Sequence, residues 1–487
     1  MLAAARGGPG RYVLAFAGLV PLFFAIANAG PSRAFMLGWL AGTVYNLLLV
    51  PWVVHTMVLY GGMPWLEAIL CLLLLCAYLG VYWAVFALLL RRAGLWQAPL
   101  ILMLLEHVIA RLFTGFPWTL LGYTQVHNRP LLQLAELGSV YLVGLVLVYV
   151  NVCVFHFIVQ RRIAWLAMGL AVLAIISIQG LMRCKSLDVP GRTLRVAYAQ
   201  PNVPQDVKMD RGEQERLTRD IFQLMEQLIP CAPDIIVLPE TAFNYALVYS
   251  KTYARLLEWT REHRIAVLAG AEDIQFTADR QRRYFNAGFY FPGQNGPVAR
   301  YYKNHLVPFG EYLPLADYPI INKLRNIIPM DITPGDRREW FTGPLIPNLT
   351  IISPICFEVI FPEEIALWLR GHDTRLIATL TNDAWFAYSR ASYQHFHQVI
   401  FRAVENRCPA LMVANTGVSG FVDRLGRAQG MSGLFNRATV CREVTVHKGP
   451  QTLWQRTAAW QFYACALAFI LLSLLQRRGR VVRARHA

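Results

Sequence analysis

The chain has 487 residues, of which 55% are hydrophobic and 16% are charged. Soluble globular proteins carry about 25% charged residues, so this composition excludes an ordinary soluble protein. The formal net charge of +16 would suit nucleic-acid binding, but many arginines form short clusters beside apolar segments, as they do in membrane proteins. We therefore expect a membrane partner and no nucleic-acid partner.

The cysteines and short motifs also limit the class of protein. Nine cysteines are irregularly spaced without a C-x-x-C pair, and several lie inside apolar segments. A disulfide framework is not expected in a chain of this length and spacing. The chain has no G-x-x-x-x-G-K-[ST] or H-E-x-x-H motif, so we expect no nucleotide, metal or other cofactor.

The first part of the chain is an almost continuous series of apolar segments. A helix needs about 20 residues to cross a hydrocarbon core, and seven segments reach or approach that length: 12–29, 34–60, 65–90, 99–116, 137–159, 163–182 and 460–475. Their number and length argue against buried helices of a soluble protein. Residues 1–185 and 458–476 are therefore predicted to form transmembrane helices.

Arginine clusters predict how these segments are oriented. Arg91-Arg92, Arg161-Arg162 and the basic tail 477–487 should face the cytoplasm. The long stretch between the sixth and seventh segments would then lie outside the cytoplasm. Arg6 and Arg11 conflict with this orientation, because seven spans would also place the N-terminus outside.

The fourth segment and the loop after it contain unusual residues. Glu106, His107 and Arg111 are ionisable groups inside an apolar segment, where such groups pair with one another or mark a functional site. The sequence leaves both roles open. Loop 115–125 is expected at the outer membrane surface, where Trp118 and Tyr123 would serve as interfacial anchors.

The composition changes near residue 193 and indicates an α/β domain that extends to residue 447. Strand patterns alternate with helical spacing of apolar residues; the strand patterns are 194–200, 234–240 and 265–271, and the helical ones are 211–228 and 253–263. This alternation predicts an α/β fold.

Three candidate catalytic residues lie at or just past strand-like segments of this domain: Glu240, Lys303 and Cys356. A carboxylate can take the proton of a thiol as general base. An ammonium favours the thiolate and stabilises an oxyanion. Such a set would form a thioester, which predicts acyl transfer or amide hydrolysis. Each residue also has a plainer interpretation: Cys356 as a small core residue, Glu240 as a helix cap and Lys303 as a surface charge.

Several motifs around these residues resemble the nitrilase, or carbon–nitrogen hydrolase, family, whose catalytic residues are glutamate, lysine and cysteine in this order. The matching segments are 238–241, 302–314, 355–358, 381–386, 394–395 and 402–407. Segment 115–125 and the spans on both sides of the domain further resemble the apolipoprotein N-acyltransferase family. The resemblance implies a polytopic α-helical membrane bundle plus an α/β nitrilase-like domain, an α-β-β-α sandwich, at 193–447.

The resemblance also implies an activity. Enzymes of that family move an acyl chain from a phospholipid, usually phosphatidylethanolamine, to the free amine of the diacylglyceryl-cysteine of an apolipoprotein. By this resemblance Cys356 is the nucleophile, Glu240 the base and Lys303 the oxyanion stabiliser. Glu311 and Glu358 are further active-site acids, which would orient Lys303, although Glu358 could also be a solvated carboxylate. The expected location is the bacterial inner membrane, with the catalytic domain facing the periplasm.

Three features depart from the family pattern. There is one membrane segment fewer than usual, Phe357 stands in the active site where tyrosine is common, and Met209 stands where tryptophan is common. Because a thioester must be kept from water, segments 243–253 or 312–330 would be lids, or else plain surface packing. Two alternatives stay open: a membrane-tethered amidase that uses water, and a non-catalytic protein that binds lipids or lipoproteins.

Overall fold

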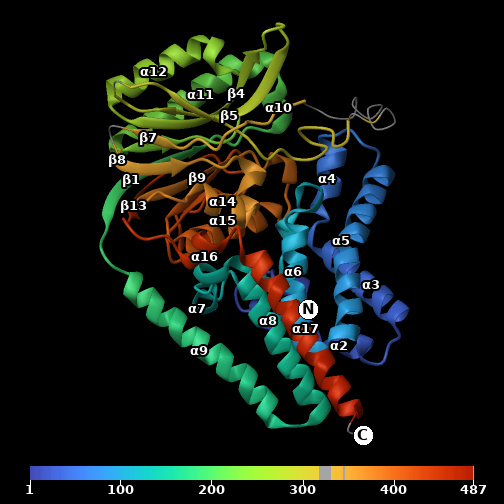
Figure 1. Cartoon of the computed structure of the whole chain (residues 1–487). Coiled ribbons are helices and arrows are strands. Elements are labelled where there is room, and N and C mark those ends of the chain that lie inside the picture. Colours follow the sequence, from blue (N-terminus) through green and yellow to red (C-terminus); the bar gives the residue numbers. More distant parts are fainter. Residues whose placement is uncertain (295, 317, 319–330, 344–345, 486–487) are drawn as a thin grey trace. The chain divides into compact units, whose positions relative to one another are not determined.

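The computed structural model describes residues 1–294, 296–316, 318, 331–343 and 346–485, without the side chains of 346 and 477–485 (Figure 1). The chain divides into two compact units. The first comprises Met1–Val54, Pro64–Asp188 and Thr452–Ala487, and the second comprises His55–Met63 and Val189–Gln451. The first unit is helical, and the second contains all strands of the described residues.

The helical unit is built from long apolar helices joined by short ones. Its helices are α1 (Leu2–Ala5), α2 (Val20–Ala27), α3 (Pro31–Leu49), α5 (Trp65–Ala93), α6 (Ala98–Ile109), α7 (Arg129–Leu132), α8 (Ala135–Gln160), α9 (Ile163–Leu187), α16 (Leu453–Thr457) and α17 (Gln461–Arg485). Helix α4 (Trp52–Leu59) begins in this unit and ends in the other.

Among the described residues, three helices are long and apolar enough to cross a membrane: α5, α8 and α9. Helices α3 and α4, bent by 58° at their junction, count as a fourth if they form one span. This is fewer than the seven spans expected, because the other three segments form shorter apolar helices. The fourth segment, for example, ends its helix at Ile109, before Phe113 and Thr114 adopt positive φ angles of 51° and 74°.

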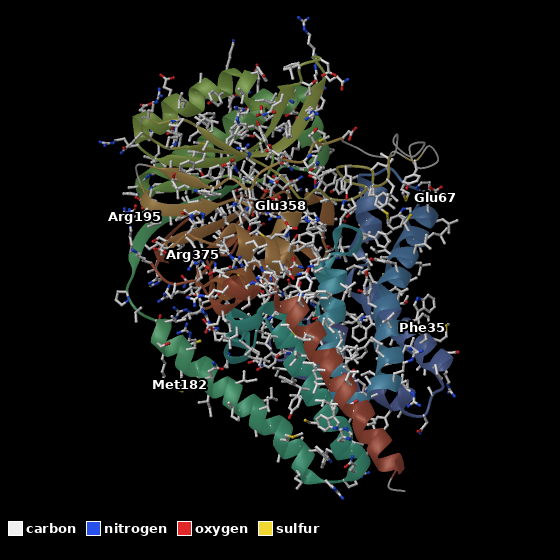
Figure 2. All side chains as sticks on the ribbon, viewed as in Figure 1. Phe35, Glu67, Met182, Arg195, Glu358 and Arg375 are labelled. Atoms are coloured by element: carbon white, nitrogen blue, oxygen red, sulfur yellow. A yellow bond between two sulfur atoms is a disulfide. The ribbon has the colours of Figure 1, made fainter. Side chains whose placement is uncertain are left out.

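Helix α9 carries apolar side chains on its exposed surface. Ile175, Ile178 and Met182 are each more than half exposed, and Figure 2 shows Met182 extending from this helix. Contiguous exposed apolar surface is rare on soluble proteins. A hydrocarbon environment around α9 explains it.

The prediction that Trp118 and Tyr123 are interfacial anchors is wrong, because both side chains are buried in the helical unit. Buried irregular backbone needs hydrogen-bond partners, and side chains from distant helices provide them here. Arg6 Nη1 donates to the Trp118 carbonyl at 3.0 Å, and Glu106 Oε1 accepts from the Leu121 N–H at 2.6 Å.

These contacts bear on the open question of the ionisable residues in the fourth segment. Glu106 bonds to backbone in the loop, whereas Arg111 Nη1 lies 3.1 Å from His107 Nδ1 and donates to the His107 carbonyl at 2.9 Å. Glu106 therefore has a structural role in holding the loop.

The second unit is an α-β-β-α sandwich, as the resemblance implied. One sheet has the order β13-β1-β2-β4-β5-β6, with β3 paired to β4, and the other has the order β12-β11-β10-β9-β8-β7. The first sheet contains β1 (Arg192–Gln200), β2 (Ile235–Val237), β3 (Phe243–Ala246), β4 (Ala266–Phe276), β5 (Arg282–Phe291), β6 (Ala299–Tyr302) and β13 (Ala438–Val446). The second contains β7 (Phe341–Gly343), β8 (Ile346–Ile352), β9 (Arg375–Thr381), β10 (Ala410–Ala414), β11 (Gly420–Val422) and β12 (Ala428–Gln429).

Helices cover the two outer faces of this sandwich. Helices α11 (Gln214–Glu226) and α12 (Lys251–His263) lie on the first sheet, and α14 (Pro362–Trp368) and α15 (Ala391–Asn406) lie on the second (Figure 1). A short helix, α10 (Gln205–Met209), follows β1. Apolar side chains of α11 and α12, such as Phe222 and Trp259, form one core with the first sheet.

Of the two lid candidates, 243–253 is packing rather than a lid. It contains β3 and continues into α12, and Phe243 and Leu247 are buried in the core of the first sheet. The other candidate, 312–330, lies mostly outside the described residues.

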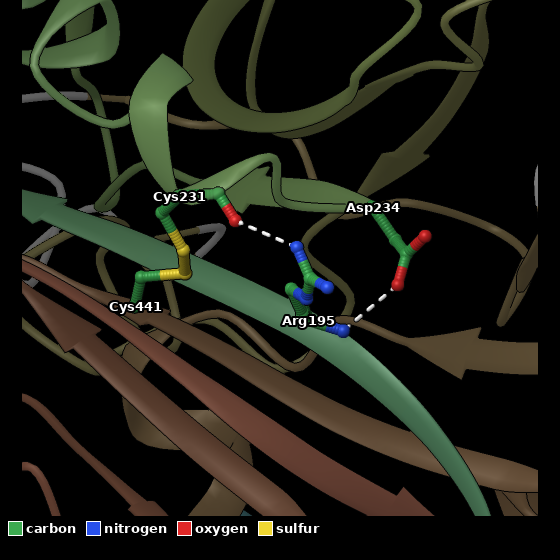
Figure 3. The surroundings of a disulfide bond; sticks show 4 residues. All are labelled: Arg195, Cys231, Asp234 and Cys441. Carbon is green, nitrogen blue, oxygen red and sulfur yellow. Dashed lines mark hydrogen bonds between the residues drawn. A yellow bond between two sulfur atoms is a disulfide. The ribbon is translucent and has the colours of Figure 1, made fainter.

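The structure contains a disulfide that the cysteine spacing did not predict. Cys231, which ends the 3₁₀ turn η7 (Ile229–Cys231), is bonded to Cys441 on β13 (Figure 3). The two cysteines are 210 residues apart in sequence, and their Cα atoms lie 6.6 Å apart. The pairing of β1 with both β13 and β2 brings them together, and sequence spacing carries no information about that pairing. Arg195 holds the same corner by donating to the Cys231 carbonyl at 3.2 Å.

Candidate active site

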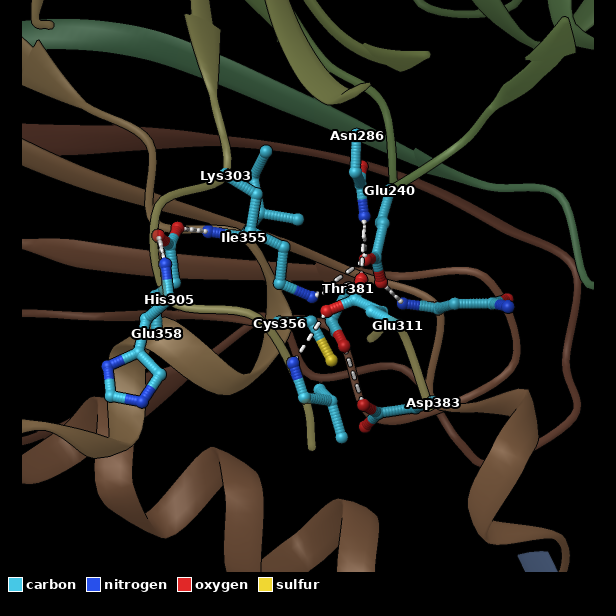
Figure 4. Close-up of polar contacts among 12 residues, drawn as sticks. Glu240, Asn286, Lys303, His305, Glu311, Ile355, Cys356, Glu358, Thr381 and Asp383 are labelled. Atoms are coloured by element: carbon cyan, nitrogen blue, oxygen red, sulfur yellow. Dashed lines mark hydrogen bonds and ion pairs between the residues drawn. The ribbon is translucent and has the colours of Figure 1, made fainter. Parts of the chain in front are cut away.

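Glu240, Lys303 and Cys356 come together in the α/β unit (Figure 4). Glu240 follows β2, Lys303 directly follows β6, and Cys356 begins the 3₁₀ turn η10 (Cys356–Ile360) after β8. Two of these strands belong to the first sheet and β8 to the second. The packing of the two sheets against each other therefore brings the three side chains together.

Lys303 is buried beside two carboxylates, so the interpretation as a surface charge is wrong. Its side chain is 1% exposed, and its Nζ lies 2.8 Å from Glu311 Oε1 and 3.5 Å from Glu240 Oε1. Burial alone would lower the pKa of Lys303, but the charges of Glu311 and Glu240 raise it above its ordinary value. These charges therefore favour the ammonium form of Lys303.

Glu240 is held by two hydrogen bonds as well as by the lysine. Asn286 Nδ2 donates to Oε1 at 2.7 Å, and the Asn382 N–H donates to Oε2 at 2.9 Å. Strand β3 follows this residue, so Glu240 does not cap a helix. With both oxygens engaged, the carboxylate has one orientation, as proton transfer to or from a nearby group requires.

Cys356 occupies a strained backbone position, with a φ of 51°. Non-glycine residues rarely adopt this conformation, and when they do it is often at functional sites. The Cys356 carbonyl oxygen lies 3.0 Å from His395 Nε2, and His395 Nδ1 lies 3.0 Å from Asp383 Oδ1. This chain of contacts connects the cysteine turn to helix α15.

The electrostatic surroundings of the Cys356 sulfur favour its protonated form. Burial raises the pKa of the thiol well above its ordinary value, the charges of Glu240 and Asp383 raise it further, and Lys303 opposes them. A thiol with a raised pKa is a poor nucleophile until a base removes its proton. A carboxylate at the same site can supply that base.

Glu358 ties together the two loops that present Lys303 and Cys356. Its Oε1 accepts from the Asn304 N–H at 2.8 Å, and its Oε2 accepts from the Ile355 N–H at 2.7 Å. Burial raises the pKa of Glu358, against the effect of hydrogen bonds from the Ile355 and His305 N–H groups. At 3% exposure it is not a solvated carboxylate. Glu358 accepts hydrogen bonds from backbone N–H groups, whereas Glu311 makes an ion pair with Lys303.

Phe357 points into an aromatic cluster. Its ring lies 5.2 Å from that of Phe361 and 5.7 Å from that of His305, between centroids, and the side chain is 8% exposed. A ring at this position supports the turn that carries Cys356 by packing.

Two residues of the site were not found from the sequence. Asn286 is 6% exposed on β5, and Lys208 on α10 is 5% exposed, with its Nζ donating to the Glu240 carbonyl at 3.0 Å. Burial lowers the pKa of Lys208 to about 8, against the charges of Glu240 and Glu272. The sequence feature that could have pointed to Asn286 is its single amide side chain within the apolar segment 285–291.

The arrangement suits nucleophilic attack on an acyl carbonyl. It combines a protonated thiol, an oriented carboxylate and a buried ammonium. The ammonium can stabilise negative charge on a carbonyl oxygen, because such a charge is felt strongly where water is excluded.

Comparison with known proteins gives matches along nearly the whole chain. Residues 1–153 match the family model of the apolipoprotein N-acyltransferase N-terminal domain, and residues 195–449 match that of carbon-nitrogen hydrolase. An apolipoprotein N-acyltransferase from Geobacter metallireducens is 33% identical, covering 99% of this chain and 94% of the relative. One from Methylococcus capsulatus is 31% identical, covering 90% and 87%. A solved CN-hydrolase superfamily protein from Xanthomonas campestris covers 55% of this chain and 95% of its own, with 17% identity and a TM-score of 0.40.

Proposed function

Because this chain belongs to the apolipoprotein N-acyltransferase family, we propose that it acylates the α-amine of the diacylglyceryl-cysteine of apolipoproteins. The proposed donor is a phospholipid, preferably phosphatidylethanolamine, and the acyl chain passes through a thioester on Cys356. One observation carries the assignment of residues: the buried Lys303 ammonium, 3.5 Å from Glu240 Oε1, whose charge also acts on the Cys356 thiol.

In the first half-reaction Glu240 accepts the thiol proton while Cys356 Sγ attacks the ester carbonyl of the phospholipid. Lys303 stabilises the oxyanion of the tetrahedral intermediate. The ester C–O bond then breaks, the leaving alkoxide takes the proton from Glu240, and a lysophospholipid departs. The acyl chain remains bonded to sulfur, and Glu240 is again a carboxylate.

In the second half-reaction the free amine of the acceptor attacks the thioester carbonyl. Glu240 accepts a proton from the amine, and Lys303 again stabilises the oxyanion. The C–S bond breaks, and the departing thiolate takes the proton from Glu240. An amide has formed, and Cys356 has returned to the thiol that its surroundings favour at rest.

We further propose that the protein lies in the bacterial inner membrane, with 1–185 and 458–476 in the bilayer, 193–447 in the periplasm and 477–487 in the cytoplasm. Two observations support this. The Cys231–Cys441 disulfide belongs to an oxidising compartment, and the arginine clusters between the apolar helices suit the cytoplasmic face.

The test uses purified full-length protein in detergent. Incubation with phosphatidylethanolamine should add the mass of one acyl chain to the peptide that contains Cys356. A diacylglyceryl-cysteine peptide should then remove the adduct and gain that mass. The Cys356→Ala variant is the control. An adduct released equally fast without the peptide would favour the amidase, and phospholipid binding without any adduct would favour a non-catalytic protein.

A further inference from the structure

A short piece of chain from between two long apolar helices belongs to the α/β unit. Residues His55–Met63 lie in sequence between α3 and α5, yet they group with Val189–Gln451. They comprise the second half of α4 and the turn that follows it. The catalytic domain expected from the sequence, 193–447, does not include them.

This segment holds the turn that follows β9. Thr56 Oγ1 donates to the Trp385 carbonyl at 2.8 Å, and Tyr60 OH donates to the Ala384 carbonyl at 2.9 Å. The Tyr60 and Trp385 rings meet edge to face, with 5.1 Å between centroids. Two hydrogen bonds and a ring contact therefore reach consecutive residues of one short turn, η11 (Ala384–Phe386).

The turn is strained at both ends. Asp383 before it has a φ of 50°, and Ala387 after it has a φ of 46°. Such conformations persist only where the surrounding structure holds them. The contacts of Thr56 and Tyr60 are made to the residues between these two strained positions.

The same turn begins at the residue that reaches Cys356. Asp383 is 1% exposed; its Oδ1 accepts from Thr381 Oγ1 at 2.7 Å and lies 3.0 Å from His395 Nδ1. His395 Nε2 in turn lies 3.0 Å from the Cys356 carbonyl oxygen. The path from Tyr60 to the nucleophile passes through Ala384, Asp383 and His395.

We propose that Thr56 and Tyr60 are positioning residues, which fix the 384–386 turn and thereby hold Asp383 and His395 against the backbone of Cys356. The expected effect on the rate of acyl transfer rests on the proposed function. The expected effect on the Cys356 thiol does not. One consequence is that a fragment limited to 193–447 lacks part of its active-site support.

The test compares the double variant Thr56→Val/Tyr60→Phe with wild type, in the full-length protein. Both substitutions keep the side-chain shape and remove only the hydroxyl donors. The matched control is Tyr249→Phe, an exposed tyrosine of the same unit. Thr56→Ser/Tyr60→Phe restores one donor and should recover part of any loss.

The first readout is alkylation of Cys356 by iodoacetamide across pH, followed on the Cys356 peptide by mass spectrometry. The charged groups that act on this thiol are Glu240, Lys303 and Asp383. Loosening the turn lets Asp383 move from the thiol, so the alkylation midpoint should shift to lower pH. A change in fold stability alone would not move this midpoint.

The second readout is the rate of acyl-enzyme formation from phosphatidylethanolamine. It should fall roughly ten- to hundredfold, because a misplacement of about 1 Å at a reacting group costs up to about 10²-fold. An unchanged midpoint and an unchanged rate would overturn the inference. If the double variant does not fold, Tyr60→Phe alone and Thr56→Val alone decide by the same readouts. If wild type forms no acyl-enzyme, the proposed function fails, and alkylation still decides on Thr56 and Tyr60.

Discussion

At the scale of single residues, Glu240 acts on Cys356 in two ways that one variant can separate. Its charge raises the pKa of the thiol, and its carboxylate is the proposed base. Glu240→Gln should therefore move the pH midpoint of Cys356 alkylation down, so the free thiol becomes more reactive near neutral pH.

The same Glu240→Gln variant should lose acyl-enzyme formation by about 10²- to 10⁴-fold, the usual contribution of a general base. Iodoacetamide labelling and acyl-enzyme mass measure the two effects on one sample. Gln retains a hydrogen-bonding oxygen for Asn382, so the loop should hold. A variant that kept the wild-type acylation rate would remove Glu240 from the role of base.

Lys303 should have the opposite effect on the thiol. Its charge lowers the pKa of Cys356, so Lys303→Met should move the alkylation midpoint to higher pH and also abolish acyl-enzyme formation. Lys251→Met, at the exposed start of α12, is the matched control and should change neither quantity. A Lys303→Met midpoint at or below that of wild type would contradict the arrangement of charges described above.

The sequence identified the chemical groups of this site, but only some of the residues that orient them. Glu240, Lys303 and Cys356 were accessible because each lies at or just past a strand-like pattern within a specific motif. Asn286 and Lys208 could not be predicted, because both contact Glu240, which is distant in sequence and becomes their neighbour only when the chain folds. Glu358 was found, but its action on backbone N–H groups depends on loop geometry that no spacing encodes.

At the scale of elements, the Cys231–Cys441 disulfide joins η7 to β13, which is the outermost strand of the first sheet. An edge strand gains pairing on one side only, so a covalent link stabilises it. Cys231→Ser should lower the free energy of unfolding by about 2–4 kcal/mol, the usual range for a native disulfide. Denaturant titration in detergent measures it.

The matched control for the disulfide is Cys184→Ser, since Cys184 does not belong to the Cys231–Cys441 disulfide. Reducing agent should destabilise the wild type and Cys184→Ser but leave Cys231→Ser unchanged. Equal sensitivity of all three to reductant would mean that Cys231 is not disulfide-bonded in the protein.

The apolar helices also show what sequence patterns do not predict, namely where a helix bends or ends. Apolar length predicted a helix in each of the seven segments, and each contains one. Apolar length alone could not predict which helices stay unbroken. Pro51 lies at the bend between α3 and α4, and α6 ends before residues with positive φ angles. Likewise Trp118 and Tyr123 fit an interface by composition, but both are buried. Polar side chains from three helical regions form hydrogen bonds with the backbone of the loop that carries them.

At the scale of the whole molecule, the proposed topology places the α/β unit and the basic tail on opposite sides of one membrane. Arginine-rich segments are retained in the cytoplasm, and a disulfide persists outside it, so both features favour the same orientation. A cysteine introduced on each side tests it: Arg261→Cys on exposed α12 and Arg483→Cys in the tail. In intact spheroplasts a membrane-impermeant maleimide should label Arg261→Cys, and it should label Arg483→Cys only after permeabilisation. The parent protein gives the background from native cysteines. The reverse pattern would place the catalytic unit in the cytoplasm, where neither the disulfide nor a periplasmic lipoprotein acceptor would be expected.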